Sequence, residues 1–135
     1  MTRVPILYDP DCGFCRVCMA SVLSWDRQRR LRPVPLGSEE ADRLLAGMPE
    51  DERMASWHLI APDGGVHSAG AAFPPLLRLL PRGGRLARLS ARFPHASERG
   101  YRRVADRRSA FGSAIPGRIR RWADAVISGS AADGR

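Results

Sequence analysis

The 135-residue sequence contains no lysine, and each of its 22 basic residues is arginine. It also has no run approaching the roughly 18 consecutive apolar residues that a membrane-spanning helix needs. Its first residues turn polar too early for a secretory signal, so we expect no membrane span and a cytoplasmic location. Apolar residues still make up 44% of the chain, which excludes global disorder and is enough for one domain with one core.

Cysteine is scarce and unevenly placed. The only three cysteines, Cys12, Cys15 and Cys18, lie within the stretch "LYDPDCGFCRVC". Thiols are kept reduced in the cytoplasm, so a Cys-x-x-Cys pair there indicates redox chemistry or a metal site and not a structural disulfide.

The charge is also uneven along the chain. The segment Arg78–Arg121 has thirteen Arg and two acidic residues, hence a net charge of +11, whereas residues 1–77 have eight Arg and ten acids, a net −2. Such a segment could attract nucleic acid, an acidic partner or an anionic membrane surface. No RNA-binding or zinc-finger signature accompanies it and few aromatics interleave, so we expect a solvated Arg-rich helix face and no nucleic-acid partner.

The first half of the sequence alternates strand and helix patterns. "RVPILY" (3–8) predicts a buried strand, and residues 13 to about 30 predict an amphipathic helix with Asp11 as its N-cap. Residues 31–36 form a second strand candidate, whose prolines favour a sheet edge. Ser38 is a plausible N-cap for a short helix that ends at Gly47.

The second half begins with a hairpin pattern and then becomes helical. Residues 56–61 and 66–68 predict two strands joined by the turn Pro62-Asp63-Gly64-Gly65. Leucines at 76–80, the Leu86/Leu89 pair and the stripe at Tyr101, Val104 and Ala105 predict three helices. A last short helix is expected near residues 115–128, followed by a mobile tail.

A Cys-x-x-Cys placed between a first strand and a first helix is the layout of a thioredoxin-like α/β fold. We therefore predict a small mixed sheet with this pair at the N-terminus of the first helix, plus a helical, Arg-rich C-terminal extension. The expected division is a thioredoxin-like domain over residues 1–110, and a short helix with a mobile tail over residues 111–135.

The spacing assigns roles to two of the thiols. Cys12, at the helix N-terminus, would meet unpaired backbone N–H groups that favour its thiolate, so it is the predicted nucleophile. Cys15, one turn later, is the predicted resolving thiol. Arg16 would further stabilise a thiolate, whereas Asp9 and Asp11 would oppose it. Asp9 is a candidate proton acceptor for Cys15, with a turn residue as the alternative.

Cys18 shares a helical face with Phe14 and Val22, so we expect it to pack as a small hydrophobic residue. The alternative is a metal or iron–sulfur module that uses Cys12, Cys15 and Cys18. A ferredoxin-like run needs a fourth cysteine, which the chain lacks, and a zinc site would need a histidine. His58 and His67 are expected to be surface or structural residues, and no bound metal or other cofactor is expected.

"YDPDCGFC" resembles the signature of the DCC family of thiol–disulfide oxidoreductases, an apolar strand followed by Tyr-Asp-Gly-x-Cys-x-x-Cys. Tyr8, Asp9, Cys12 and Cys15 match, while Pro10 replaces the glycine. "HLIAPDGGVHSAGAAF" and "YRRVADRR" resemble later elements of that family, so the resemblance covers about residues 4–108. It implies a thioredoxin-like fold and a dithiol redox activity. We expect a thiol or disulfide substrate, and reducing equivalents from a cytosolic thiol system.

Thioredoxins carry a cis-proline before the strand that faces the Cys-x-x-Cys, but the corresponding stretch here, "ERMASW", has no proline. Either a residue near Ala55 or Ser56 takes this role with a trans bond, or the substrate docks differently. Phe14, Arg16 and Ser56 are the expected substrate contacts. Arg108 either reaches the active site or, as we favour, pairs with a helix C-terminus or a carboxylate, while Tyr101 packs on the sheet.

Overall fold

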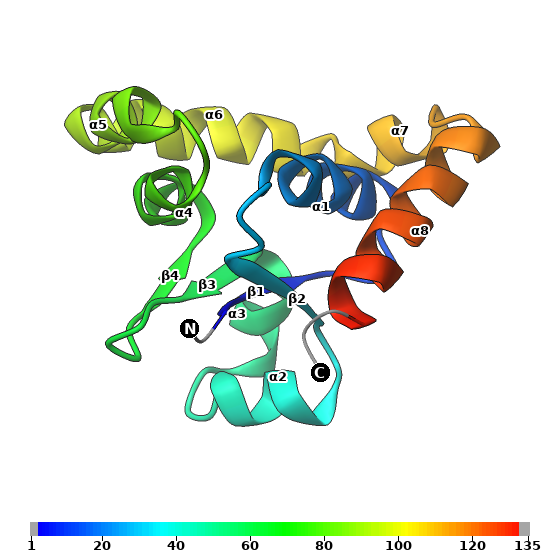
Figure 1. Ribbon diagram of the computed structural model, residues 1–135, viewed down its shortest axis with the longest axis horizontal. Coiled ribbons are helices and arrows are strands. Elements are labelled where there is room, and N and C mark those ends of the chain that lie inside the picture. Colours follow the sequence, from blue (N-terminus) through cyan, green and yellow to red (C-terminus); the bar gives the residue numbers. More distant parts are fainter. Residues whose placement is uncertain (1–2, 133–135) are drawn as a thin grey trace.

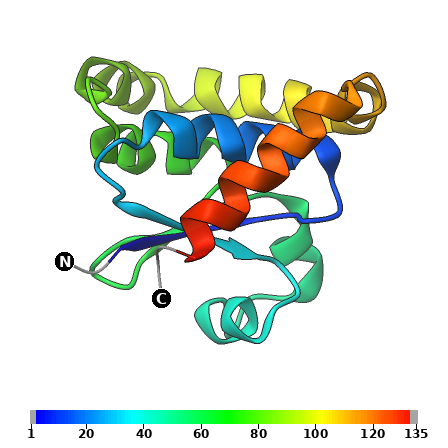
Figure 2. The ribbon, with the colours of Figure 1, turned by 45° about the vertical axis from the view of Figure 1, so that its right-hand side comes forward.

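The computed structural model describes residues 3–132, which form a four-stranded mixed sheet covered by helices on both faces (Figures 1 and 2). The strand order is β2-β1-β3-β4. Strand β1 (Val4–Tyr8) pairs in parallel with β2 (Leu31–Pro35) and antiparallel with β3 (His58–Ile60), which itself pairs antiparallel with β4 (Val66–Ser68).

Helix α1 (Gly13–Trp25) connects the parallel strands β1 and β2, as a parallel pair requires. Successive side chains of β1 point to opposite faces of the sheet, so the core has two layers. Val4, Ile6 and Tyr8 pack with α1, α4 and α8, whereas Leu7 points to the other face, where it meets Ala41 and Leu45 near α2.

The helices form three groups around the sheet. Helices α2 (Glu39–Leu44) and α3 (Glu50–Ala55) lie on one side, and α1, α4 (Phe73–Leu79) and α8 (Gly117–Ala132) lie on the other (Figures 1 and 2). The 3-10 turn η1 (Ala69–Ala72) precedes α4. An outer layer over α1 and α4 consists of α5 (Gly84–Arg92), α6 (Pro94–Asp106) and α7 (Arg108–Ser113).

Several local predictions are confirmed. Strand β2, with Pro33 and Pro35, is an edge strand. The β3–β4 hairpin turns at the predicted residues, with Gly64 at φ +86°, a conformation that glycine adopts at little cost. The Ser38 side chain caps α2 by accepting the Ala41 N–H.

Helix α1 is shorter than predicted, because the chain turns at Asp26. Asp26 is only 3% exposed. Its carboxylate accepts the backbone N–H groups of Arg30 (3.0 Å) and Leu31 (2.8 Å), and so fixes the turn into β2. Helix α3 was not predicted, because it buries no residue and therefore has no apolar periodicity to detect.

Helix α8 is longer than the predicted short helix, and it is not peripheral. It packs on α1 and β2, and the Arg3 guanidinium bonds both the carbonyl (3.0 Å) and the hydroxyl (3.1 Å) of Ser130. Residues 129–132 were expected in a mobile tail but are helical, and residues 133–135 of that tail lie outside the described residues.

This architecture confirms the predicted thioredoxin-like α/β fold: a small mixed sheet, with the Cys-x-x-Cys pair at the start of α1. Over residues 3–132, no helix has both the length and the apolar character needed to cross a membrane.

Candidate functional site

The Cys-x-x-Cys pair is built into the N-terminus of α1. Cys12 has extended backbone angles and is the N-cap residue, and its Sγ accepts the backbone N–H of Cys15 at 3.3 Å. Asp11, the predicted N-cap, is instead exposed and does not cap the helix. The reason is local: the Asp9 side chain accepts the Asp11 N–H at 3.0 Å and forms a turn that delays the helix by one residue. A sulfur atom therefore occupies the capping position, where backbone N–H groups favour an anion.

The two thiols differ in their surroundings. Burial, a hydrogen bond to Cys12 and the charge of Cys12 together raise the pKa of Cys15 to about 12, while Arg108 opposes the shift. Cys15 therefore keeps its proton at neutral pH while Cys12 accepts hydrogen bonds. Both cysteines are half-buried, and no disulfide joins them in the structure.

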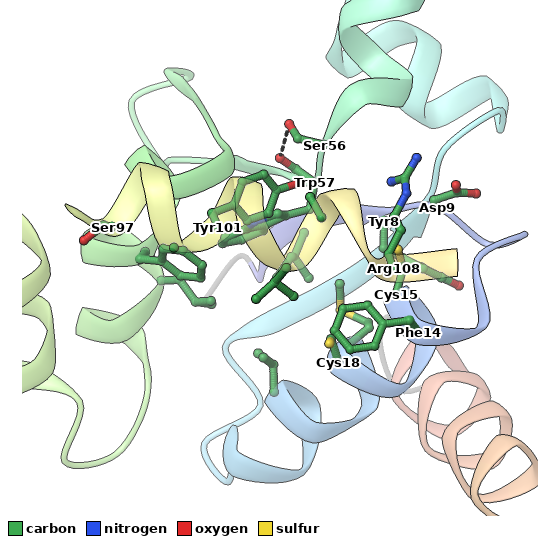
Figure 3. A pocket seen from close by; sticks show the side chains of 18 of the residues that line it. Tyr8, Asp9, Phe14, Cys15, Cys18, Ser56, Trp57, Ser97, Tyr101 and Arg108 are labelled. Atoms are coloured by element: carbon green, nitrogen blue, oxygen red, sulfur yellow. Dashed lines mark hydrogen bonds between the residues drawn. The ribbon is translucent and has the colours of Figure 1, made fainter. Parts of the chain in front are cut away.

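A pocket of about 600 Å³ lies beside this pair, between α1, α6 and the residues that precede β3 (Figure 3). Its lining is mostly aliphatic and aromatic. The lining residues are Ile6, Tyr8, Asp9, Phe14, Cys15, Cys18, Met19, Val22, Ser56, Trp57, Phe73, Leu76, Ala96, Ser97, Gly100, Tyr101, Val104, Ala105 and Arg108.

Four of the predicted site residues, Asp9, Phe14, Cys15 and Ser56, lie together in this lining. The Phe14 ring also contacts the Phe111 ring of α7, with centroids 5.3 Å apart. The peptide bonds around Ser56 are trans, as expected, because the described residues contain no cis bond. Cys12 stands next to the lining, at the tip of the helix.

Arg16 is placed differently from the other predicted contacts. Its guanidinium forms an ion pair with Asp124 of α8 at 3.3 Å and donates to the Pro10 carbonyl at 3.1 Å. It does not line the pocket. Arg16 thus ties α8 to the loop before Cys12.

Cys18 was expected in the core, and this prediction is wrong. Cys18 as a whole is exposed to solvent, although it also lines the pocket beside Cys15. Burial within that lining raises its pKa, with a further contribution from Cys12. The residues of α1 that face the core are Met19, Ala20 and Leu23. Met19 and Leu23 each come one position after a residue of the predicted apolar face, Cys18 and Val22.

Tyr101 and Arg108 also line the pocket, so the favoured interpretation of Arg108 is not supported (Figure 3). The half-buried Arg108 has no ion pair or hydrogen bond from its side chain to another described residue, and its positive charge lowers the pKa of Cys15. Burial raises the pKa of Tyr101, opposed by hydrogen bonds with the Trp57 backbone and the Ser56 side chain. The signal in the sequence was the stretch "YRRVADRR", which holds both Tyr101 and Arg108.

His58 is a structural residue, as predicted. It is 1% exposed, and its ring bonds the Ser68 hydroxyl (2.6 Å) and the Arg53 carbonyl (2.9 Å). Within residues 3–132, no three side chains of His, Cys, Asp or Glu gather in a group that could hold a metal ion. The Arg side chains of α5, Arg85, Arg88 and Arg92, are exposed, as expected for a solvated face.

The sequence was compared with protein families, curated proteins and solved structures. Residues 6–114 match the family described as DCC1-like thiol-disulfide oxidoreductase. Neither the curated proteins nor the solved structures give a match. The family match spans most of the chain, including the Cys-x-x-Cys pair, the hairpin and α6. This chain therefore belongs to the DCC1-like thiol-disulfide oxidoreductase family.

Proposed function

We propose that this protein catalyses thiol–disulfide exchange, with Cys12 as the nucleophile and Cys15 as the resolving thiol. The observation that carries the proposal is the asymmetry of the pair. Cys12 Sγ accepts a backbone N–H at the helix N-terminus, whereas the half-buried Cys15 retains its proton. A nucleophile held at a helix N-terminus beside a thiol that keeps its proton is the arrangement that a two-step exchange needs.

In the first step the Cys12 thiolate attacks a substrate disulfide, forms a mixed disulfide and releases one substrate thiolate. In the second step Cys15 loses its proton and attacks Cys12 Sγ, which gives the Cys12–Cys15 disulfide and the second thiolate. The first step itself prepares the second. Once Cys12 is in a mixed disulfide it no longer carries the charge that helps raise the pKa of Cys15.

Asp9 is the proposed proton acceptor for Cys15. Its carboxylate is half-buried in the same pocket lining, and its charge contributes to the raised pKa of Cys15. Oδ1 accepts the Asp11 N–H, so we assign the proton to Oδ2. Phe14 and Ser56 are the proposed substrate contacts. A cytosolic dithiol would reduce the disulfide after each turnover, and no bound cofactor takes part.

The test is a redox titration in glutathione buffers with the cysteines mapped by mass spectrometry. We expect a reversible Cys12–Cys15 disulfide while Cys18 remains a thiol. Cys12→Ser should abolish turnover and Cys15→Ser should accumulate mixed disulfides on Cys12, with Cys18→Ser as the matched control that retains activity. Failure to form an intramolecular disulfide at any glutathione ratio would contradict the proposal, as would loss of turnover in a folded Cys18→Ser variant.

A further inference from the structure

The pocket beside the cysteines is larger than thiol exchange alone requires. Its volume of about 600 Å³ is within the range of small-molecule sites, roughly 300–1,000 Å³. The rings of Phe14, Trp57, Phe73 and Tyr101 form much of its wall. The ring centroids of Trp57 and Phe73 are 5.5 Å apart, and those of Phe73 and Tyr101 are 6.2 Å apart. A wall of this kind gives the largest binding free energy when it buries an apolar group of a ligand.

Charge is confined to one end of the pocket. The charged residues of the lining are Asp9 and Arg108, which lie near Cys15 in Figure 3, away from the aromatic end at Tyr101. A ligand that enters the pocket would therefore hold its apolar part against the rings and its reacting sulfur near Cys12 and Cys15.

Helix α6 limits the shape of the ligand. It lies across the pocket from Ser56 and Trp57, and it is held there by Glu98, whose Oε2 accepts the Gly70 N–H at 2.9 Å. A Cβ added at Gly70 would lie 2.7 Å from Glu98 Cα, so η1 and α6 approach closely because this residue is glycine. Helix α6 therefore walls the pocket on the side opposite Ser56, which favours a compact ligand.

We infer that the pocket binds an apolar small molecule that itself carries the reacting disulfide. The reaction, though not the binding, rests on the function proposed above. The Cys12 thiolate cleaves the ligand's S–S bond and one half leaves as a thiolate, while the other half stays on Cys12 with its body in the pocket. Cys15 then releases this second half as a thiolate, so the ligand gains two electrons and the Cys12–Cys15 disulfide forms.

The test compares two disulfides that share one leaving-group type and differ in their apolar body: N,N′-dibenzoylcystamine and N,N′-diacetylcystamine. Each rate is divided by the rate of the same compound with dithiothreitol, which removes intrinsic reactivity. The expected kcat/KM for the dibenzoyl compound is higher by about tenfold or more, since even one methylene in an apolar pocket is worth roughly 10- to 200-fold. Equal normalised values for the two compounds would overturn the inference.

Two glycine variants assign the preference to the pocket. Gly100 of α6 lines it, and a Cβ added there meets no atom within 4 Å, so Gly100→Leu places a side chain in open space. Gly129 of α8 is equally open but is absent from the lining, so Gly129→Leu is the matched control. We expect Gly100→Leu to lower the dibenzoyl preference at least about fivefold and the control to leave it unchanged. A preference that survives in folded Gly100→Leu contradicts the inference.

Binding of the unreactive N-benzoyl-S-methylcysteamine, measured by calorimetry, separates the two proposals. If it binds the intact protein and Gly100→Leu weakens it, the pocket assignment holds even where no exchange is detected, and only the exchange proposal fails. If exchange proceeds on both disulfides but this ligand does not bind, the pocket assignment fails and the exchange proposal stands.

Discussion

The raised pKa of Cys15 leads to a quantitative prediction. Burial, the hydrogen bond to Cys12 and the charge of Cys12 raise this pKa from its ordinary value of 9.0 to about 12. At neutral pH that shift reduces the thiolate fraction of Cys15 about a thousandfold. Cys12→Ala removes the two contributions of Cys12 but leaves burial. The pKa of Cys15 should therefore fall in this variant, while staying above its ordinary value.

The assay is alkylation by iodoacetamide between pH 6 and pH 11, with the modified cysteines identified by mass spectrometry. It is run in a Cys18→Ser background, so that only the Cys-x-x-Cys pair reacts. A Cys15 pKa of about 12 predicts an alkylation rate that still rises with pH at pH 11, whereas a lower pKa gives a plateau within the range; the shape of the curve does not depend on how accessible the sulfur is. A Cys15 midpoint near 9 in the otherwise intact protein would refute the reasoning, as would an unchanged curve in the Cys12→Ala variant.

Further predictions concern the surroundings of the pair. Asp26→Ala should lower the free energy of unfolding, measured with urea, by about 2 kcal/mol or more, because two backbone N–H groups lose their acceptor in a buried turn. Arg108→Gln should raise the pKa of Cys15 further and slow decay of the mixed disulfide in stopped-flow measurements. Burial lowers the pKa of His58, so the unfolded chain binds its proton more readily. Stability should therefore fall as the pH drops below about 6.5, and His58→Gln should lose this dependence. Cys18→Ser should change the unfolding free energy by less than about 0.5 kcal/mol, because the residue is exposed.

Much of the fold could be predicted because its signals are local. The apolar run of β1, the Ser38 cap and the Gly-containing turn of the β3–β4 hairpin each specify a short piece of backbone. The order of these pieces, with a Cys-x-x-Cys after the first strand, then indicated the thioredoxin-like arrangement. Signals of this kind depend only on residues close together in the sequence, so they can be recognised without the structure.

The errors concern residues whose environment is supplied by distant segments. Arg16 looks like a partner for a thiolate, but α8 brings Asp124 to it from the other end of the chain. Cys18 is on the apolar stripe of α1, yet that stripe faces a pocket closed by α6.

By itself the sequence determined the Cys-x-x-Cys pair: the identity and spacing of Cys12 and Cys15, and their place at the start of a helix, follow from a few consecutive residues. Only the tertiary structure decided what surrounds the pair. It made Cys12 the cap in place of Asp11, left Cys15 half-buried, and set Arg108 and the aromatic wall beside them. The physical reason is that burial and electrostatic environment depend on side chains that meet through packing, and α6 and α7 reach this site from about ninety residues away in the chain.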